Sequence, residues 1–232
     1  MSDDPTGYNA LLDANVETRL SSARIVLGEL FKAFSPQSVL DIGCGHGAWL
    51  RVARELGADE IQGVDGPWID PDSLLIPKQY FTHHDLTHAI DVSGQFDLVM
   101  SLEVAEHLPA HASDTFIESM ARHGDIILFS AAVPFQGGHG HINEQWPGYW
   151  AGKFADHGFK TIDTLRPLIW SNQDVFWWLR QNTLLFMNET ALGAYPDFQN
   201  TVVDDFDSLA VIHPELYVRW VRLAQQAAGP AQ

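Results

Sequence analysis

The sequence predicts an α/β protein built on a doubly wound, mostly parallel sheet. Three observations carry this prediction. Short apolar runs alternate with segments of helical periodicity, a glycine cluster separates the first apolar run from the helix after it, and 46% of the 232 residues are apolar. Strands that alternate with helices form right-handed crossovers, so helices cover both faces of a parallel sheet.

The expected strands are short apolar runs bounded by turn-forming residues. In chain order they cover residues 38–42, 60–65, 80–83, 96–101, 125–130, 160–164 and 183–187. The expected helices are segments whose apolar residues recur every three or four positions. They cover residues 9–33, 48–56, 111–122, 144–157 and 214–227. Periodicity leaves open whether the last strand runs parallel or antiparallel to its neighbours.

One domain is expected over residues 1–232, because the sequence contains no internal repeat and no linker. It divides into an N-terminal helical addition (1–35), a core (36–190) and a tail that ends in a helix (191–232). The addition is expected either to close over a ligand as a lid or to pack on the edge of the sheet. Its polar candidates for ligand contact are Tyr8, Asn9 and Arg19.

Charge and composition exclude several classes of function. The 13 basic and 30 acidic residues give a net charge of −17, which repels a phosphate backbone, so no nucleic-acid partner is expected. The single cysteine, Cys44, excludes an internal disulfide and a cysteine-rich zinc site. The N-terminus is acidic without an apolar stretch, and no run approaches the roughly 20 apolar residues of a membrane helix. We therefore expect a soluble, cytoplasmic protein without a membrane partner.

The strongest local signal is Asp41-Ile-Gly43-Cys-Gly45-His-Gly47, between the first strand and the first core helix. Glycines there permit a sharp turn and let a ligand approach the backbone without meeting a Cβ. Asp65 ends the next expected strand, where a carboxylate can accept hydrogen bonds from ribose hydroxyls. This combination predicts a nucleoside-containing ligand.

Two kinds of nucleoside ligand compete for this loop. Gly43-x-Gly45-x-x-Ala48 also satisfies the relaxed nicotinamide fingerprint, so a nicotinamide-dependent oxidoreductase is an alternative. Asp41 decides the preference, because an anion at the lip of the loop repels a pyrophosphate but suits a ligand with an ammonium and a sulfonium. The sequence lacks Gly-Lys-Ser/Thr, which excludes a nucleoside-triphosphate loop.

The segment Val39-Leu-Asp-Ile-Gly-Cys-Gly-His-Gly47 resembles the first motif of the class I S-adenosylmethionine (SAM)-dependent methyltransferases. Gly63-Val-Asp65 resembles their ribose-binding strand end, and His84-Asp-Leu86 the element that contacts adenine. The resemblance covers roughly residues 36–190. It implies a Rossmann-like sheet of seven strands with the last one antiparallel. Residues 132–187 also resemble bacterial methyltransferases of surface-glycan or natural-product pathways.

The resemblance also implies roles for individual residues in binding SAM. The amino-acid end of SAM is assigned to Asp41, Gly43, Gly45 and Gly47. The ribose is assigned to Asp65, with Gly66 and Trp68 beside it. The adenine is assigned to Asp85 and Leu86, and the surroundings of the sulfonium to Glu103.

Methyl transfer to a hydroxyl requires alignment of donor and acceptor and removal of the acceptor's proton. Imidazole is the side chain best suited to accept a proton near neutral pH. His139 and His141, in the glycine-rich loop after the fifth strand, are the favoured bases, and His107 is the fallback. The alternative for the first two histidines is a loop that caps the following helix.

The spacing Glu103-x-x-Glu106-His107 resembles that of ubiquinone-pathway O-methyltransferases and small-RNA 3′-terminal methyltransferases. In those enzymes such residues bind Mg²⁺, and a hard cation lowers the pKa of a hydroxyl acceptor. The resemblance therefore implies a possible metal site at Glu103, Glu106 and His107, completed by His139 or His141. The alternative is that Glu106 and His107 only organise the loop.

Aromatic residues gather in two segments of the second half of the chain. Trp146, Tyr149, Trp150 and Phe154 recur at helical spacing, which favours core packing over ligand binding. A second group is expected to form an aromatic and amide-rich wall for a sugar or a phenol. Its members are Arg166, Trp170, Asn172, Gln173, Phe176, Trp177, Trp178, Arg180 and Gln181.

The expected function is transfer of a methyl group from SAM to a hydroxyl of a small molecule, a sugar or a secondary metabolite. Metal-assisted methylation of an RNA 3′ end is one alternative, although the net charge of −17 opposes it. A SAM-binding protein without turnover is another.

Overall fold

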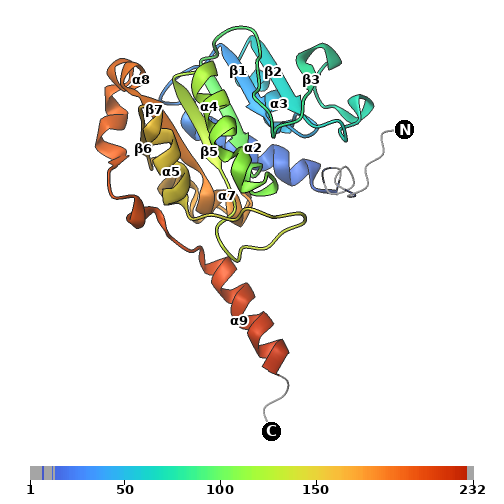
Figure 1. The fold of residues 1–232 in the computed structure, drawn as a ribbon, viewed down its shortest axis with the longest axis vertical. Helices are drawn as coiled ribbons and strands as arrows, with labels where there is room; N and C mark the ends of the chain where they lie inside the picture. The colour runs from blue at the N-terminus through green and yellow to red at the C-terminus, as the bar shows by residue number, and fades with distance from the viewer. Residues whose placement is uncertain (1–6, 8–11, 13, 229–232) are drawn as a thin grey trace.

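A computed structural model describes residues 7, 12 and 14–228 of the chain. At its centre lies one eight-stranded sheet with the strand order β3-β2-β1-β4-β5-β7-β6-β8 (Figure 1). The strands are β1 (Ser38–Ile42), β2 (Glu60–Asp65), β3 (Phe81–His83), β4 (Leu98–Leu102), β5 (Ile126–Ser130), β6 (Phe159–Ile162), β7 (Leu184–Asn188) and β8 (Val202–Val203).

The strand directions confirm the mostly parallel sheet. Strands β1 to β5 pair in parallel, whereas β7 is antiparallel to both β5 and β6. The antiparallel strand implied by the resemblance is therefore present. The predicted number of seven strands was wrong, because Val202 and Val203 form an additional edge strand that pairs with Thr161 and Ile162. Two residues are too few to produce a periodic signal.

The helices are α2 (Val16–Leu30), α3 (Ala48–Glu55), α4 (Ser113–His123), α5 (Pro147–Asp156), α6 (Leu165–Ile169), α7 (Trp177–Asn182), α8 (Glu189–Ala194) and α9 (Pro214–Ala228). The expected core helices are confirmed, with boundaries shifted by a few residues. The short helices α6, α7 and α8 were not predicted, since five or six residues barely exceed one helical turn.

Alternation along the strands divides the core into two layers. In β5, Ile126 and Leu128 pack with residues of α2, α3 and α6, whereas Ile127 and Phe129 pack with residues of α4 and α5. Successive side chains of a strand point to opposite faces, so each strand that is apolar throughout must be covered on both sides.

The aromatic residues of α5 pack into the second of these layers. Trp150 and Phe154 are buried, and the Phe154 ring stacks on Phe186 with centroids 4.0 Å apart. Trp146, at the start of the helix, is 43% exposed. Core packing is thus the role of the buried members of this group.

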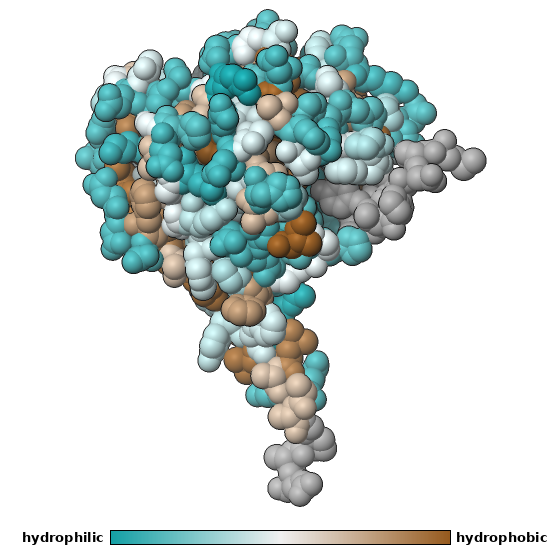
Figure 2. All heavy atoms as spheres, in the orientation of Figure 1, coloured by the Kyte–Doolittle hydropathy of each residue, from teal (hydrophilic) through white to brown (hydrophobic). Residues whose placement is uncertain are grey.

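Two segments flank the sheet. Helix α2 packs against α3 and α6, and Leu12 lies buried against the glycine loop at Gly45. The candidates Tyr8 and Asn9 lie outside the described residues. Helix α9 projects away from the sheet, and apolar side chains line much of its surface (Figures 1 and 2). Within residues 7, 12 and 14–228, we find no helix with the length and apolar content required to cross a membrane.

Candidate active site

The loops that follow β1, β2, β4 and β5 meet at one edge of the sheet. These four strands are parallel, so their carboxyl ends lie side by side, which is where open α/β sheets bind ligands. The edge carries the glycine loop, Asp65, residues 103–107 and the glycine-rich loop 136–141. All the predicted catalytic residues belong to these loops.

The glycine loop follows β1 in a conformation that requires glycine. Gly43 has a φ of +84°, and its amide donates to the Val64 carbonyl at 2.7 Å. A Cβ at Gly43 would lie 2.3 Å from the Val104 side chain. Any larger residue at this position would therefore be strained and would collide with the loop after β4.

Asp65 holds the glycine loop against the end of β2. Its carboxylate is buried and accepts hydrogen bonds from the amides of Gly45 at 2.7 Å and Gly66 at 2.6 Å. Burial raises the pKa of Asp65 to about 6, although these two amides, His83 and a hydrogen bond from the Trp68 side chain favour the charged form. The residue that the resemblance assigns to the ribose thus orders the loop.

Asp41 presents a buried acceptor that lacks a partner. Its Oδ2 atom has no hydrogen bond within the described part of the chain, and the residue is 2% exposed. Burial, followed by repulsion from Asp65, raises the pKa of Asp41 to about 8, while Arg19 acts in the opposite direction. A buried oxygen without a partner is costly, so a cationic ligand group would stabilise it.

A first cavity of about 230 Å³ opens in front of the glycine loop. It is lined by Gly43, Asp65, Trp68, Leu86, Val104, His107, Leu108, His139 and Gly140. The Trp68 ring packs against Gly66, where a Cβ would be 2.2 Å from the indole. Asp85 is exposed, and its carboxylate accepts hydrogen bonds from the amide and hydroxyl of Thr87 instead of lining this cavity.

A second cavity, of about 290 Å³, lies next to the first. It is lined by Arg19, Glu103, Glu106, His107, Gln136, Gly137, Gly138, His141, Trp177, Trp178 and Arg219. His107 lines both cavities and therefore stands at their junction. The two favoured histidines lie in different cavities: His139 lines the first and His141 the second.

His141 is held by a carboxylate, as a general base requires. Its Nδ1 atom lies 2.8 Å from Glu144 Oε1, and Glu144 also accepts from the amides of Gly137 and Phe135. The other ring nitrogen, Nε2, faces Gly138, where a Cβ would lie only 2.1 Å from it. The bare backbone of Gly138 thus leaves room for the imidazole at the wall of the second cavity.

His107 sits beside His141 at the junction. The two rings meet edge to face with centroids 4.9 Å apart, and His107 Nδ1 lies 3.3 Å from the Gly140 carbonyl oxygen. Burial, and then the charge of His141, lowers the pKa of His107 to about 4. His107 is therefore neutral at pH 7.

Glu103 directly follows β4 in a strained conformation with a φ of +57°. Its carboxylate accepts hydrogen bonds from the side-chain amides of Asn182 at 3.0 Å and Gln136 at 3.2 Å. Burial raises its pKa despite these bonds. Because two amides already engage this carboxylate, its predicted role as a metal ligand gains no support.

Glu106 differs from Glu103, since the described residues offer neither of its carboxylate oxygens a hydrogen bond of good geometry. The side chain is fully buried. Burial and the neighbouring Glu103 raise its pKa well above its usual range. One ligand atom each from Glu106, His107 and His141 lie within 4.8 Å of one another. This set contains two of the three predicted metal ligands and one of the two histidines expected to complete them.

A family model described as "Methyltransferase domain" matches residues 12–173, which include the glycine loop, Asp65 and all three candidate histidines. The chain belongs to the class I SAM-dependent methyltransferases. SAM is accordingly the cofactor, and the nicotinamide-dependent alternative does not hold.

Curated relatives of this methyltransferase align with only part of it. A ribosomal protein L11 methyltransferase of Geobacter metallireducens is 30% identical over 118 residues, which are 48% of this chain and 38% of the relative. The chain thus matches well under half the length of that relative.

Solved structures extend the likeness in fold. An O-methyltransferase family protein from Burkholderia thailandensis has a TM-score of 0.58 and 18% identity, and the match covers 80% of this chain and 60% of that one. The mitomycin 7-O-methyltransferase MmcR has a TM-score of 0.55 and 10% identity, over 80% and 58% of the two chains.

Several residues of the methyltransferase's site were missed from the sequence. Val104, Leu108 and Gln136 line the cavities without having been assigned a role, and Asn182, which binds Glu103, belongs to a helix that was not predicted. Arg219 reaches the second cavity from α9, far along the chain. Only the contact between His141 and Glu144 could have been predicted from the sequence, because a spacing of three residues corresponds to about one helical turn.

The predicted aromatic wall is formed in part. Trp177 and Trp178 line the second cavity of the methyltransferase. Arg166 and Arg180 are instead buried and bind residues of the C-terminal tail. Arg166 donates to the Leu209 carbonyl at 2.9 Å, and Arg180 forms an ion pair with Glu215.

Proposed function

We propose that this methyltransferase transfers the methyl group of SAM to a hydroxyl of a small molecule, a sugar or a secondary metabolite. The observation that carries the proposal is the pair of adjacent cavities with His107 at their junction and the His141–Glu144 pair in the second. A donor in the first cavity and an acceptor in the second would meet at this junction. Alignment of this kind supplies much of the rate enhancement of a displacement reaction.

In this proposal the first cavity holds SAM, which supplies an activated methyl group. The Asp41 carboxylate receives the ammonium group of its amino-acid end, and the glycine loop lies against the same end. Asp65 accepts from the ribose hydroxyls beside Gly66, and Leu86 packs against the adenine. Asp85, whose carboxylate is engaged by Thr87, keeps its adenine-binding role only as a prediction.

His141 acts as the general base in the second cavity. Its Nδ1–H donates to Glu144, which leaves Nε2 to accept the proton of the acceptor hydroxyl as the oxygen–methyl bond forms and the sulfur–methyl bond breaks. Glu144 then stabilises the imidazolium. His139 lies on the donor side, so we rank it below His141 for this role.

A divalent ion is a second way to activate the hydroxyl. Glu106, His107 and His141 would hold it, and the buried Glu106 carboxylate, which no described residue reaches with a hydrogen bond of good geometry, fits a cation. The ion would polarise the hydroxyl oxygen, and His141 would then be a ligand instead of the base. Two imidazoles suit a first-row transition ion better than the predicted Mg²⁺, which prefers oxygen ligands.

The solved structures described as O-methyltransferases support a hydroxyl acceptor. The curated relative is named for a ribosomal protein, so a protein acceptor is the competing assignment, although its alignment covers 38% of that relative. Methylation of an RNA 3′ end and SAM binding without turnover remain alternatives from the sequence. A cytoplasmic location also remains a prediction.

A transfer assay with radiolabelled SAM tests the proposal. A panel of hydroxylated sugars, phenols, an RNA oligonucleotide and purified ribosomal proteins is offered to the full chain. Label in a sugar or a phenol is the expected result. Label only in RNA or protein would overturn the acceptor class, and SAM binding without label in any acceptor would favour a protein without turnover.

A further inference from the structure

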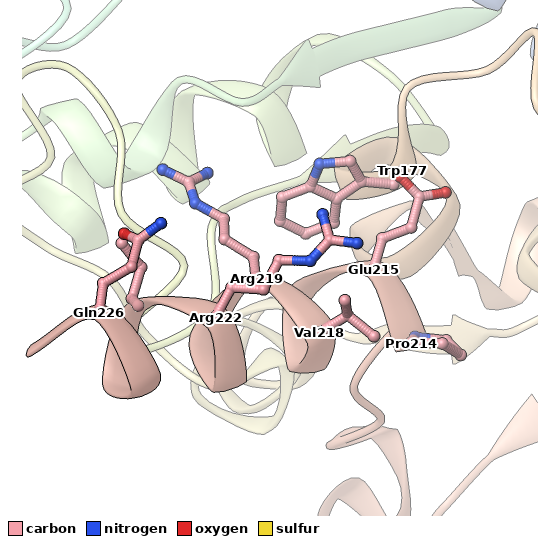
Figure 3. Close-up of a pocket in the computed structure, with 8 residues that line it drawn as sticks. Trp177, Pro214, Glu215, Val218, Arg219, Arg222 and Gln226 are labelled. Atoms are coloured by element: carbon pink, nitrogen blue, oxygen red, sulfur yellow. The ribbon is translucent and has the colours of Figure 1, made fainter. Parts of the chain in front are cut away.

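A groove along α9 lies next to the second cavity. This α9 groove has a volume of about 520 Å³ and is shown in Figure 3. Its lining residues are Trp177, Pro214, Glu215, Val218, Arg219, Arg222, Leu223 and Gln226. Trp177 and Arg219 line both the groove and the second cavity, so the two spaces lie next to each other.

Two arginines make the α9 groove locally basic. Arg219 and Arg222 are exposed, and their side chains rise from α9 on the side where Trp177 lies (Figure 3). Neither forms an ion pair within the described part of the chain, although the sequence contains 30 acidic residues. Glu215, the acidic residue of the groove lining, is already paired with Arg180.

The polar groups differ between the two spaces. At the inner end the second cavity carries the carboxyl groups of Glu103 and Glu106 next to the histidines, and Arg19 also lines it. At the outer end the α9 groove carries Arg219 and Arg222, with the flat ring of Trp177 between the two ends. A molecule with a hydroxyl at one end and an anionic group at the other matches this order.

We propose that the α9 groove binds the anionic end, a phosphate or a carboxylate, of an elongated acceptor whose hydroxyl reaches the second cavity. This proposal rests on the proposed function, because it takes the second cavity as the acceptor site. Arg219 and Arg222 donate hydrogen bonds to the anionic oxygens, as guanidinium groups do with carboxylates and phosphates. The net charge of −17 opposes general anion binding, so affinity for an anion reports on this local pair.

The test is calorimetric titration of inorganic pyrophosphate and, separately, citrate into the full chain at low ionic strength. The chain is examined alone and with bound S-adenosylhomocysteine (SAH). For the double variant Arg219→Gln/Arg222→Gln we expect the affinity for the better anion to fall about tenfold or more. The double variant Arg24→Gln/Arg51→Gln is the matched control, because it removes the same two charges from exposed helix positions that pair with Glu55. The control should bind both anions as the wild type does.

Preference for pyrophosphate assigns a phosphate-bearing acceptor and preference for citrate a carboxylate-bearing one, and either result supports the proposal. It is overturned if the wild type binds neither anion, if the variant Arg219→Gln/Arg222→Gln binds as tightly as the wild type, or if the control Arg24→Gln/Arg51→Gln weakens binding equally. The variant Arg219→Gln/Arg222→Gln should keep the wild-type affinity for SAH. If the wild type fails to bind SAH but binds pyrophosphate through the two arginines, the proposed function fails while the anion site stands.

Discussion

His141 Nδ1 lies 2.8 Å from Glu144 Oε1, and the same carboxylate oxygen accepts the amide hydrogen of Gly137. His141 precedes Glu144 by three residues, so the imidazole is held in place by its own segment of the chain. A histidine held in this way has one defined tautomer and one ring nitrogen available for chemistry. This arrangement leads to the first two predictions.

Replacement of His141 by alanine should lower turnover by about 10²–10⁴-fold, because the acceptor hydroxyl loses its base. The affinity for SAH should stay unchanged, since His141 does not line the first cavity. Steady-state kinetics and calorimetry measure the two quantities. His157→Ala, at an exposed position, is the control, and His139→Ala separates the two favoured histidines. If His139→Ala loses turnover and His141→Ala does not, the assignment is reversed.

Replacement of Gly138 by alanine should reduce turnover without removing any histidine. The new Cβ would lie 2.1 Å from His141 Nε2, so the imidazole must move away from the position where it can accept a proton. We expect a loss of at least about tenfold in kcat, in line with misplacement of a catalytic group. Gly152→Ala, where nothing lies within 4 Å, is the matched control. Wild-type kcat in Gly138→Ala would contradict the base role of His141.

Replacement of Asp65 by alanine should weaken SAH binding by about 1.5–3 kcal/mol, the usual contribution of a charged hydrogen-bond partner. The loss has two physical sources, the missing ribose contact and the freed amides of Gly45 and Gly66. Calorimetric titration measures it. Asp59→Ala, an exposed position just before β2, should bind SAH normally. Equal affinities in both variants would place the cofactor elsewhere.

SAH binding at pH 7 should release a proton from Asp41. The pKa of Asp41 is raised from 3.8 to about 8, so the free protein holds a proton there that the unfolded chain lacks. The corresponding stabilisation is complete below about pH 4 and is lost as the pH rises toward 8. An ammonium group beside the carboxyl favours its charged form, which expels the proton. Titrations in buffers of different ionisation enthalpy should report about 0.5–1 proton for the wild type.

The variant Asp41→Asn separates this proton from others. It should bind SAH more weakly and release no proton, and it should be more stable than the wild type at pH 8, by about 1 kcal/mol or more. Thermal unfolding at pH 5 and pH 8 measures the difference in stability. Proton release that persists in Asp41→Asn would assign the proton to another group.

Activity should survive treatment with a chelator. Burial and the Glu103 charge raise the pKa of Glu106, so this carboxyl can remain neutral without a cation, and His141 then acts as the base. The comparison is turnover before and after EDTA and dialysis. Loss of activity that Mn²⁺ or Mg²⁺ restores in the wild type, but not in Glu106→Gln, would assign the metal instead.

The fold was largely predictable because its central strands β1, β4 and β5 are mostly apolar on both faces and are bounded by glycine and polar turns. Strand β8 and helix α7 escaped because two and six residues are too few to display a repeating pattern. The glycine loop and Asp65 were predictable because their function depends on local spacing. The bonds of Glu103 with Asn182 and Gln136, in contrast, join residues far apart in sequence, and no local pattern records them.

The arginines show the same limit in another way. Arg180 lies beside the tryptophans in sequence, and its side chain nevertheless turns to Glu215 and the Trp170 carbonyl. Arg219, which the sequence placed in a tail, lines the second cavity. The sequence predicted an arginine beside Trp177 in the wall of the site, and it indicated Arg180. The arginine that lines the cavity with Trp177 is Arg219.

The family match ends at residue 173, whereas Trp177, Trp178 and Arg219 belong to the chain beyond it. The first cavity is therefore lined only by residues inside the family match, whereas the second combines such residues with others beyond it. We expect exchange of the C-terminal stretch between homologues to alter the second cavity and to leave the lining of the first unchanged.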